Sequence, residues 1–399
     1  MLNIGVLIIE SIYWMLQSIF SMNFFLLILL IVFFYHFLTY FLRDKKYIKK
    51  YMVREHQNFV KLEELIEVPL VNIIIPAWKE GETFRVCLKS IVDLSYPKLN
   101  VIVNVGGNDE TIKIAHSFKK YDNFKIIYQK SGEGKIKAIN DCFNHISKGI
   151  VYLIDADVIL TDNILISMLF MLLNKKEDIV VSKIIPHKSL LNNDLVKFIH
   201  INRYIRYKLS RYLNIVSQAT AMKYNIIQSI NKFSEKRKLD DGHSIGLDLI
   251  EHDFRIYSLY ETTVEAFNYS TKLSIYIDQN IRWIENTLYY CLKTRKLLVL
   301  KFIGLVILSI YIYISPFLFV FSYYLPFYGF IICLSFYLKI VRKILIFKMI
   351  DDKSSIRFHP LFFLKLIFYI LINFLINIIV FFEMIFYRKA YKRRKNLLI

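Results

Sequence analysis

The chain has 399 residues, of which 55% are hydrophobic and 16% aromatic, and it contains only 11 Gly and 7 Pro. A composition this apolar excludes a disordered or low-complexity protein, and so few Gly and Pro exclude a fibrous one. The formal net charge is +20 and the mean hydropathy is +0.39, so membrane segments are the first explanation to consider for this chain.

The N-terminal 42 residues predict a membrane anchor. Residues 23–42 carry no Lys, Arg, Asp or Glu and are long enough to cross a bilayer as a helix. A signal peptide needs basic residues ahead of its apolar run, and residues 1–42 have none, so the anchor is expected to stay uncleaved. Residues 4–20 contain Glu10 and Gln17, and they are expected to lie in the membrane interface or, alternatively, to form a second span. The basic segment that starts at Arg43 predicts that the following chain is cytoplasmic.

Residues 51–296 predict an α/β domain. Short β-branched runs occur at residues 71–75, 100–105, 124–128 and 150–154. Polar–apolar stretches such as residues 83–94 and 135–146 lie between them. This alternation is typical of a mostly parallel, Rossmann-like sheet with helices on both faces.

The C-terminal part predicts about three further spans and a basic tail. Apolar stretches occupy residues 297–322, 324–338 and 361–387, and the tail covers residues 388–399. The basic stretch at 339–359 and the tail both favour the cytoplasmic side, which three spans cannot provide for both. Either one stretch is interfacial or re-entrant, or the tail departs from the positive-inside tendency.

Two carboxylates follow the strand at 150–154, at the sheet edge where parallel α/β proteins bind ligands. Asp155 and Asp157 are two positions apart, so in an extended segment their side chains point the same way. Such a pair suits a Mg²⁺ ion that also binds the phosphates of a nucleotide. The alternative is an ordinary turn or helix cap.

The other strand ends predict a nucleotide pocket. Pro76, Ala77, Trp78 and Glu80 leave the first strand, where Trp78 can line a base pocket, and Asp109 follows a Gly-Gly-Asn turn after the second. Lys135 follows a glycine turn into a helix, an arrangement that suits a diphosphate. Each of these turns also has an ordinary structural interpretation.

Two later motifs supply further candidate groups. Asp240 and Asp241 precede an amphipathic helix, where they fit either a helix N-cap or a general base. Gln279, Arg282 and Trp283 share one helical face and offer an amide, a guanidinium and an indole to hydroxyls, phosphate and a sugar ring. Alternatively, Trp283 only anchors this helix at the membrane interface.

The order PAWKE, GGNDET, GEGKIKAIN, DAD, LDD, QNIRW over residues 70–290 resembles the membrane-bound processive branch of family 2 glycosyltransferases, which includes cellulose, chitin, hyaluronan and poly-N-acetylglucosamine synthases. The resemblance implies a GT-A fold, a UDP-linked nucleotide-sugar donor and a Mg²⁺ or Mn²⁺ ion. It also implies a role for each matched residue. Asp155 and Asp157 would bind metal and diphosphate, with Lys135 near the donor and Asp109, Pro76 and Glu80 in the nucleotide pocket. Asp241 would be the base, and Gln279, Arg282 and Trp283 would bind the diphosphate and the acceptor end.

Three departures from the family pattern affect these assignments. Lys79 stands where the family usually has Asn, and the aspartate that usually ends the second strand is replaced around residues 105–107. LDD replaces the family's Thr-Glu-Asp, which makes Asp240 a rival to Asp241 as the base.

The sequence therefore predicts an inverting transferase that moves a sugar to a growing polysaccharide at the cytoplasmic membrane face. Single transfer to a membrane lipid is the alternative, and a non-catalytic transporter subunit or scaffold is a remote one because most acids lie outside the spans. Four or five spans are few for a polymer channel, so a homo-oligomer or partner subunit is expected.

The remaining composition fits a cytoplasm-facing membrane enzyme. The four cysteines show no CxxC spacing, which predicts reduced structural thiols. No nucleic-acid-binding motif accompanies the basic charge. Residues 301–399 hold 14 Lys and Arg against 3 acids, a distribution that fits attraction to anionic membrane lipids.

Overall fold

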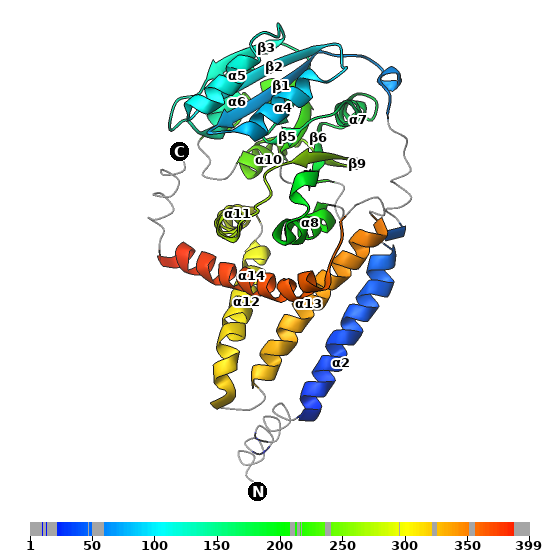
Figure 1. Ribbon diagram of the computed structural model, residues 1–399, viewed down its shortest axis with the longest axis vertical. Coiled ribbons are helices and arrows are strands. Elements are labelled where there is room, and N and C mark those ends of the chain that lie inside the picture. Colours follow the sequence, from blue (N-terminus) through cyan, green and yellow to red (C-terminus); the bar gives the residue numbers. More distant parts are fainter. Residues whose placement is uncertain are drawn as a thin grey trace. The chain divides into compact units, whose positions relative to one another are not determined.

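The computed structural model describes residues 22–46, 60–207, 218–235, 241–294, 296–320, 325–350 and 356–386, together with residues 10, 13, 48–49, 212–213 and 216. The chain divides into two compact units (Figure 1). A helical unit lies within Met1–Val53 and Thr294–Phe386, and a sheet unit lies within Arg54–Tyr276 and Arg282–Lys293. Ile277–Ile281 is grouped with the helical unit. The predicted interfacial stretch at 4–20 and the tail at 388–399 fall almost wholly outside the described residues.

The sheet unit contains one nine-stranded sheet in the order β3-β2-β1-β4-β8-β6-β9-β5, with β7 paired to β9. One half is parallel and consists of β1 (Val71–Trp78), β2 (Leu99–Gly106), β3 (Phe124–Tyr128) and β4 (Ile150–Ile154). The other half is mixed and consists of β5 (Val158–Ile159), β6 (Ile179–Pro186), β7 (Tyr212–Leu213), β8 (Ala219–Lys223) and β9 (Ile256–Ala266). The four predicted strands are confirmed as the parallel half.

The first strand is longer than the sequence predicts. β1 pairs with β2 through Trp78, whereas its pairing with β4 ends at Ile74. Pro76 lacks an N–H, but beyond Ile74 no neighbour on the β4 side requires one. The expectation that Pro76, Ala77 and Trp78 leave the first strand is therefore wrong, because they belong to the strand itself.

Helices cover the parallel strands because these strands bury side chains on both faces. Ile74 and Ile102 pack with Ile139 and Phe143 of α6 in one buried cluster. The helices of the sheet unit are α4 (Glu82–Val92), α5 (Asp109–Ser117), α6 (Gly134–Phe143), α7 (Asp162–Leu173), α8 (Asp194–Tyr207), α9 (Tyr224–Ser229) and α10 (Asp241–Glu251), and α11 (Leu273–Thr294) follows them. This is the predicted α/β, GT-A-type architecture.

The helical unit contains α2 (Met22–Thr39, continued by a π-helical segment Tyr40–Asp44), α12 (Lys296–Ile314), α13 (Leu325–Ile350) and α14 (Pro360–Phe386). Three helical segments of the described chain are long and apolar enough to cross a membrane: Asn23–Asp44, Leu297–Val320 and Pro360–Ile385. Figure 1 shows α14 running across α12 and α13.

Helices α2 and α13 lie side by side and run in the same direction. Near their first turns the rings of Phe25 and Phe327 are 5.2 Å apart, and further along His36 Nε2 lies 3.0 Å from Ser335 Oγ. At the other end Arg342 donates from Nε to Asp44 Oδ2 at 2.8 Å, and both side chains are buried. The two helices are therefore paired along most of their length.

Candidate active site

The loop after β4 brings together the carboxylates predicted to bind metal and diphosphate. Asp155 leaves the sheet with its N–H donating to Gln218 O at 3.0 Å, and a tight turn follows in which Val158 N–H donates to Asp155 O at 3.3 Å. Lys135 Nζ donates to Asp155 Oδ1 at 2.6 Å. This bond joins the N-terminal turn of α6 to the carboxyl end of β4.

The pKa of the Asp157 carboxyl is strongly raised within this cluster. Burial, and then the neighbouring Asp155 and Glu80 carboxylates, raise the pKa of Asp157 to about 7, while Lys135 acts in the opposite direction. Asp157 Oδ1 is buried and has no hydrogen-bond partner among the described residues. An oxygen in this state lacks the partner that buried polar atoms normally have, which fits a place for a cation.

Glu80 completes the acidic cluster from the end of β1. Burial, and then Asp155, raise the pKa of the Glu80 carboxyl, and Lys135 lowers it. The turn that carries Glu80 is held from α5, because Glu80 N–H donates to Thr111 Oγ1 at 2.7 Å. Lys79 precedes it with a φ of 57°, a left-handed conformation that favours Asn over most side chains. This conformation explains why the family that the sequence resembles usually has Asn at this position.

Trp78 packs onto the glycines that end β2. A Cβ added to Gly106 would lie 2.6 Å from Trp78 Cζ3, so only glycine allows the indole to lie this close. Trp78 Nε1 is buried and has no hydrogen-bond partner among the described residues. Its role in a base pocket stays a prediction. Asp109 is the exposed first residue of α5, and its role in nucleotide binding also stays a prediction.

The proposed base lies at the start of α10. Asp241 is the first residue of this helix, but its side chain and all of Asp240 lie outside the described residues. The next residue is fixed in place, because Val216 N–H donates to Gly242 O at 3.2 Å. The choice between the two aspartates stays a prediction.

Helix α11 carries the Gln279, Arg282 and Trp283 triplet as predicted, with Arg282 exposed and the other two half-buried. The guanidinium of Arg203, on α8, lies 4.5 Å from the centroid of the Trp283 ring and 4.9 Å from that of Tyr269. These distances are within the range of cation–π attraction. Sequence reasoning missed Arg203, because no local motif marks a single Arg on a helix as a partner of a distant Trp.

Comparison with known proteins agrees with this architecture. A sequence profile described as "Glycosyltransferase like family 2" matches residues 69–286. A poly-beta-1,6-N-acetyl-D-glucosamine synthase from Staphylococcus epidermidis is 27% identical over 158 residues, which are 39% of this chain and 32% of that protein. The probable glycosyltransferase YdaM from Bacillus subtilis is 26% identical over 266 residues, 61% of each chain. The matched region thus spans about a third of the synthase and about three fifths of YdaM.

A solved structure shows the same fold. The mannosyltransferase PcManGT from Pyrobaculum calidifontis, in complex with GDP-Man and Mn²⁺, aligns with a TM-score of 0.51 at 13% identity, covering 90% of this chain and 100% of that one. The family profile covers more than half of the 399 residues. This chain therefore belongs to glycosyltransferase-like family 2, and its sheet unit is the glycosyltransferase domain.

Proposed function

We propose that this chain transfers a sugar, with inversion at the anomeric carbon, from a UDP-linked donor to a growing polysaccharide at the cytoplasmic face of a membrane. The observation that carries the proposal is the cluster of Lys135, Asp155, Asp157 and Glu80 at the carboxyl ends of β1 and β4, within a family 2 domain. The name of the S. epidermidis relative, a polymer synthase, supports the polysaccharide product.

The cluster fits a divalent cation, either Mg²⁺ or Mn²⁺. Asp155 and Asp157 would hold it, and Asp157 Oδ1 is the buried oxygen that lacks a partner among the described residues. Within the described part of the chain, no group of three or more His, Cys, Asp or Glu side chains could hold an ion alone. Two carboxylates plus donor phosphates are a common way to bind Mg²⁺. When bound, the ion supplies positive charge against the diphosphate.

The chain's own groups account for the remaining chemistry. Asp241 takes the proton from the acceptor hydroxyl as that oxygen bonds to the anomeric carbon, and the bond from that carbon to the diphosphate breaks. Lys135 and Arg282 stabilise the negative charge on the departing diphosphate. Trp78 lines the base pocket beside Pro76, Ala77 and Asp109, and Trp283 and Gln279 hold the acceptor end. Asp240 is the alternative base.

The helical unit supports a multi-pass membrane protein with a cytoplasmic catalytic domain. The π-helical segment that continues α2 reaches the basic segment that begins at Arg43. Helix α13 carries Lys339, Arg342, Lys343 and Lys348 in its second half. Because the two helices run in the same direction, these basic ends lie at the same end of the pair. The positive-inside tendency places that end, and the domain that follows α2, in the cytoplasm.

A transfer assay on the purified full chain in lipid nanodiscs tests the proposal. UDP- and GDP-sugars are supplied with and without Mn²⁺, and nucleotide release and product length are measured. We expect metal-dependent release from a UDP-sugar and a ladder of products. A single product size would favour transfer to one lipid acceptor, and no metal-dependent release would favour a non-catalytic scaffold.

Asp241→Asn and Asp240→Asn form a matched pair for the base. Loss of a general base lowers turnover about 10²- to 10⁴-fold, so we expect that loss for Asp241→Asn and near-normal turnover for Asp240→Asn. The opposite result would transfer the role to Asp240. Normal turnover in both variants would show that neither aspartate is the base.

A further inference from the structure

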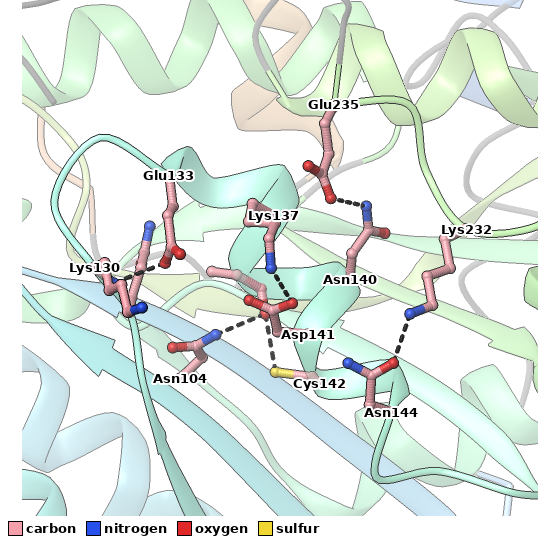
Figure 2. A network of polar contacts seen from close by, with 12 residues as sticks. Asn104, Lys130, Glu133, Lys137, Asn140, Asp141, Cys142, Asn144, Lys232 and Glu235 are labelled. Atoms are coloured by element: carbon pink, nitrogen blue, oxygen red, sulfur yellow. Dashed lines mark hydrogen bonds and ion pairs between the residues drawn. The ribbon is translucent and has the colours of Figure 1, made fainter.

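A buried amide on α6 bonds to Phe233 and Glu235, which lie on the loop between α9 and α10. Asn140 is 4% exposed, and its Nδ2 donates to Phe233 O at 2.8 Å and to Glu235 Oε1 at 3.0 Å. Its Oδ1 accepts from Phe233 N–H at 3.1 Å. Figure 2 shows Asn140 pointing from α6 towards Glu235. Both donor hydrogens and the acceptor oxygen of this amide are therefore in use, which fixes its orientation.

Other contacts fix the same segment. The Phe233 side chain is buried, with its ring centroid 5.6 Å from that of Phe143 of α6. Ser234 N–H donates to Oδ2 of the buried Asp248, on α10, at 2.7 Å. On the far side of the two aspartates, Gly242 O accepts from Val216 N–H. The segment 233–235 that bonds to α6 therefore also bonds to α10, whose first residue is Asp241.

The same helix also reaches the donor side. Lys135, in the first turn of α6, bonds to Asp155 at 2.6 Å. Residues 135 and 140 are five positions apart, which is about 7.5 Å along a helix axis at 1.5 Å per residue. Helix α6 is itself fastened to β2, because buried Asn104 donates from Nδ2 to Ala138 O at 3.0 Å. One short, anchored helix therefore contacts both Asp155 of the diphosphate cluster and the segment that bonds to α10.

We infer that Asn140 is a positioning residue, which sets the place of the general base relative to the donor held by Lys135 and Asp155. The inference rests on the function proposed above for Asp241 or Asp240. A displacement of about 1 Å in reacting groups can lower a rate about 100-fold. Loss of this amide should therefore affect the transfer step far more than donor binding.

Asn140→Ala is the direct test, in the full chain in nanodiscs, with kcat and the donor KM measured together with UDP affinity in Mn²⁺. We expect kcat to fall about 10- to 100-fold, with donor KM and UDP affinity within about threefold of wild type. A purely structural role would lower kcat and UDP affinity and raise the donor KM, together with a smaller amount of folded protein. The matched control is Asn144→Ala, which removes an exposed hydrogen bond from Lys232 Nζ to the end of the same helix and should change kcat less than twofold.

Wild-type kcat in folded Asn140→Ala protein would overturn the inference, as would equal losses of kcat and UDP affinity. If that variant does not fold, Glu235→Ala tests the positioning role in its place. Glu235 is exposed, so its removal deletes one clamp bond without opening the core. We then expect kcat to fall several-fold at unchanged UDP affinity, and an unchanged kcat would refute the positioning role. Normal turnover in both Asp241→Asn and Asp240→Asn would instead show that neither aspartate is the base. Failure of the proposed function can therefore be distinguished from failure of the positioning role.

Discussion

Replacement of Asp157 by Asn tests the electrostatics of the carboxylate cluster. Burial and two neighbouring carboxylates raise the pKa of Asp157 to about 7, from an ordinary value of 3.8. The folded state therefore holds this proton more tightly than the unfolded state. Its stabilising contribution is complete below pH 3.8 and is lost as the pH rises from there to about 7.

The size of the effect follows from that change in pKa. Each pH unit between the two values corresponds to about 1.36 kcal/mol, so ionising Asp157 in the fold costs up to about 4 kcal/mol at pH 8. This is an upper limit, because the interacting carboxylates share the titration. The amide in the variant has no charge to bury. For a domain of about 200 residues, 1 kcal/mol shifts the midpoint of thermal unfolding by about 2–4 °C.

Thermal unfolding of the detergent-purified chain at pH 5 and pH 8 provides the measurement. We expect Asp157→Asn to unfold up to about 16 °C above wild type at pH 8, with a smaller difference at pH 5. Mn²⁺ should raise the wild-type midpoint and leave that of the variant nearly unchanged, and the variant should not transfer sugar. Glu82→Gln, an exposed acid on α4, is the control and should behave as wild type. The same pH dependence in Asp157→Asn and wild type would refute the reasoning.

Three further changes test other parts of the molecule. Arg203→Gln removes the cation stacked on Trp283. A loss of about 1 kcal/mol of acceptor-binding free energy should raise the acceptor KM about fivefold with the donor KM unchanged. An unchanged acceptor KM would contradict a role for this stack. Arg342→Leu leaves buried Asp44 with the exposed Arg43 as an ion-pair partner, so we expect at most about 3 kcal/mol of lost stability in thermal unfolding. An unshifted midpoint would contradict a stabilising role for the pair of Arg342 and Asp44. An epitope tag inserted between residues 320 and 325 lies before α13, whose second half is basic and is proposed to be cytoplasmic, so the tag should bind antibody on intact cells. Labelling only after lysis would contradict the proposed orientation.

The parallel half of the fold could be predicted from the sequence because its signal is local. The runs at 71–75 and 150–154 are continuous and β-branched, as expected for strands buried on both faces. The cluster at their ends follows from the same reasoning, since parallel strands deliver their loops to one edge. Lys135 and Asp155 meet there as expected.

The mixed half and the supporting contacts could not be predicted in this way. β6 pairs with β9 and β8, which come from distant parts of the chain, and no periodicity within one strand specifies its partner. Asn140 reads as an ordinary polar residue within an amphipathic helix, and its amide acquires partners only when the chain around Phe233 folds back onto α6. Pairings of this kind depend on topology, which one sequence does not reveal.

The charges of the carboxylate cluster bear on how the proposed donor would bind. Three carboxylates, those of Glu80, Asp155 and Asp157, lie near one lysine, Lys135. Burial, and then repulsion among the carboxylates, raise the pKa values of Glu80 and Asp157. A donor diphosphate would add further negative charge, so the cluster alone opposes the ligand that Lys135 would attract. A divalent cation reverses the balance, because it supplies positive charge to both partners. The arrangement of the acids therefore favours binding of the donor and a divalent cation together.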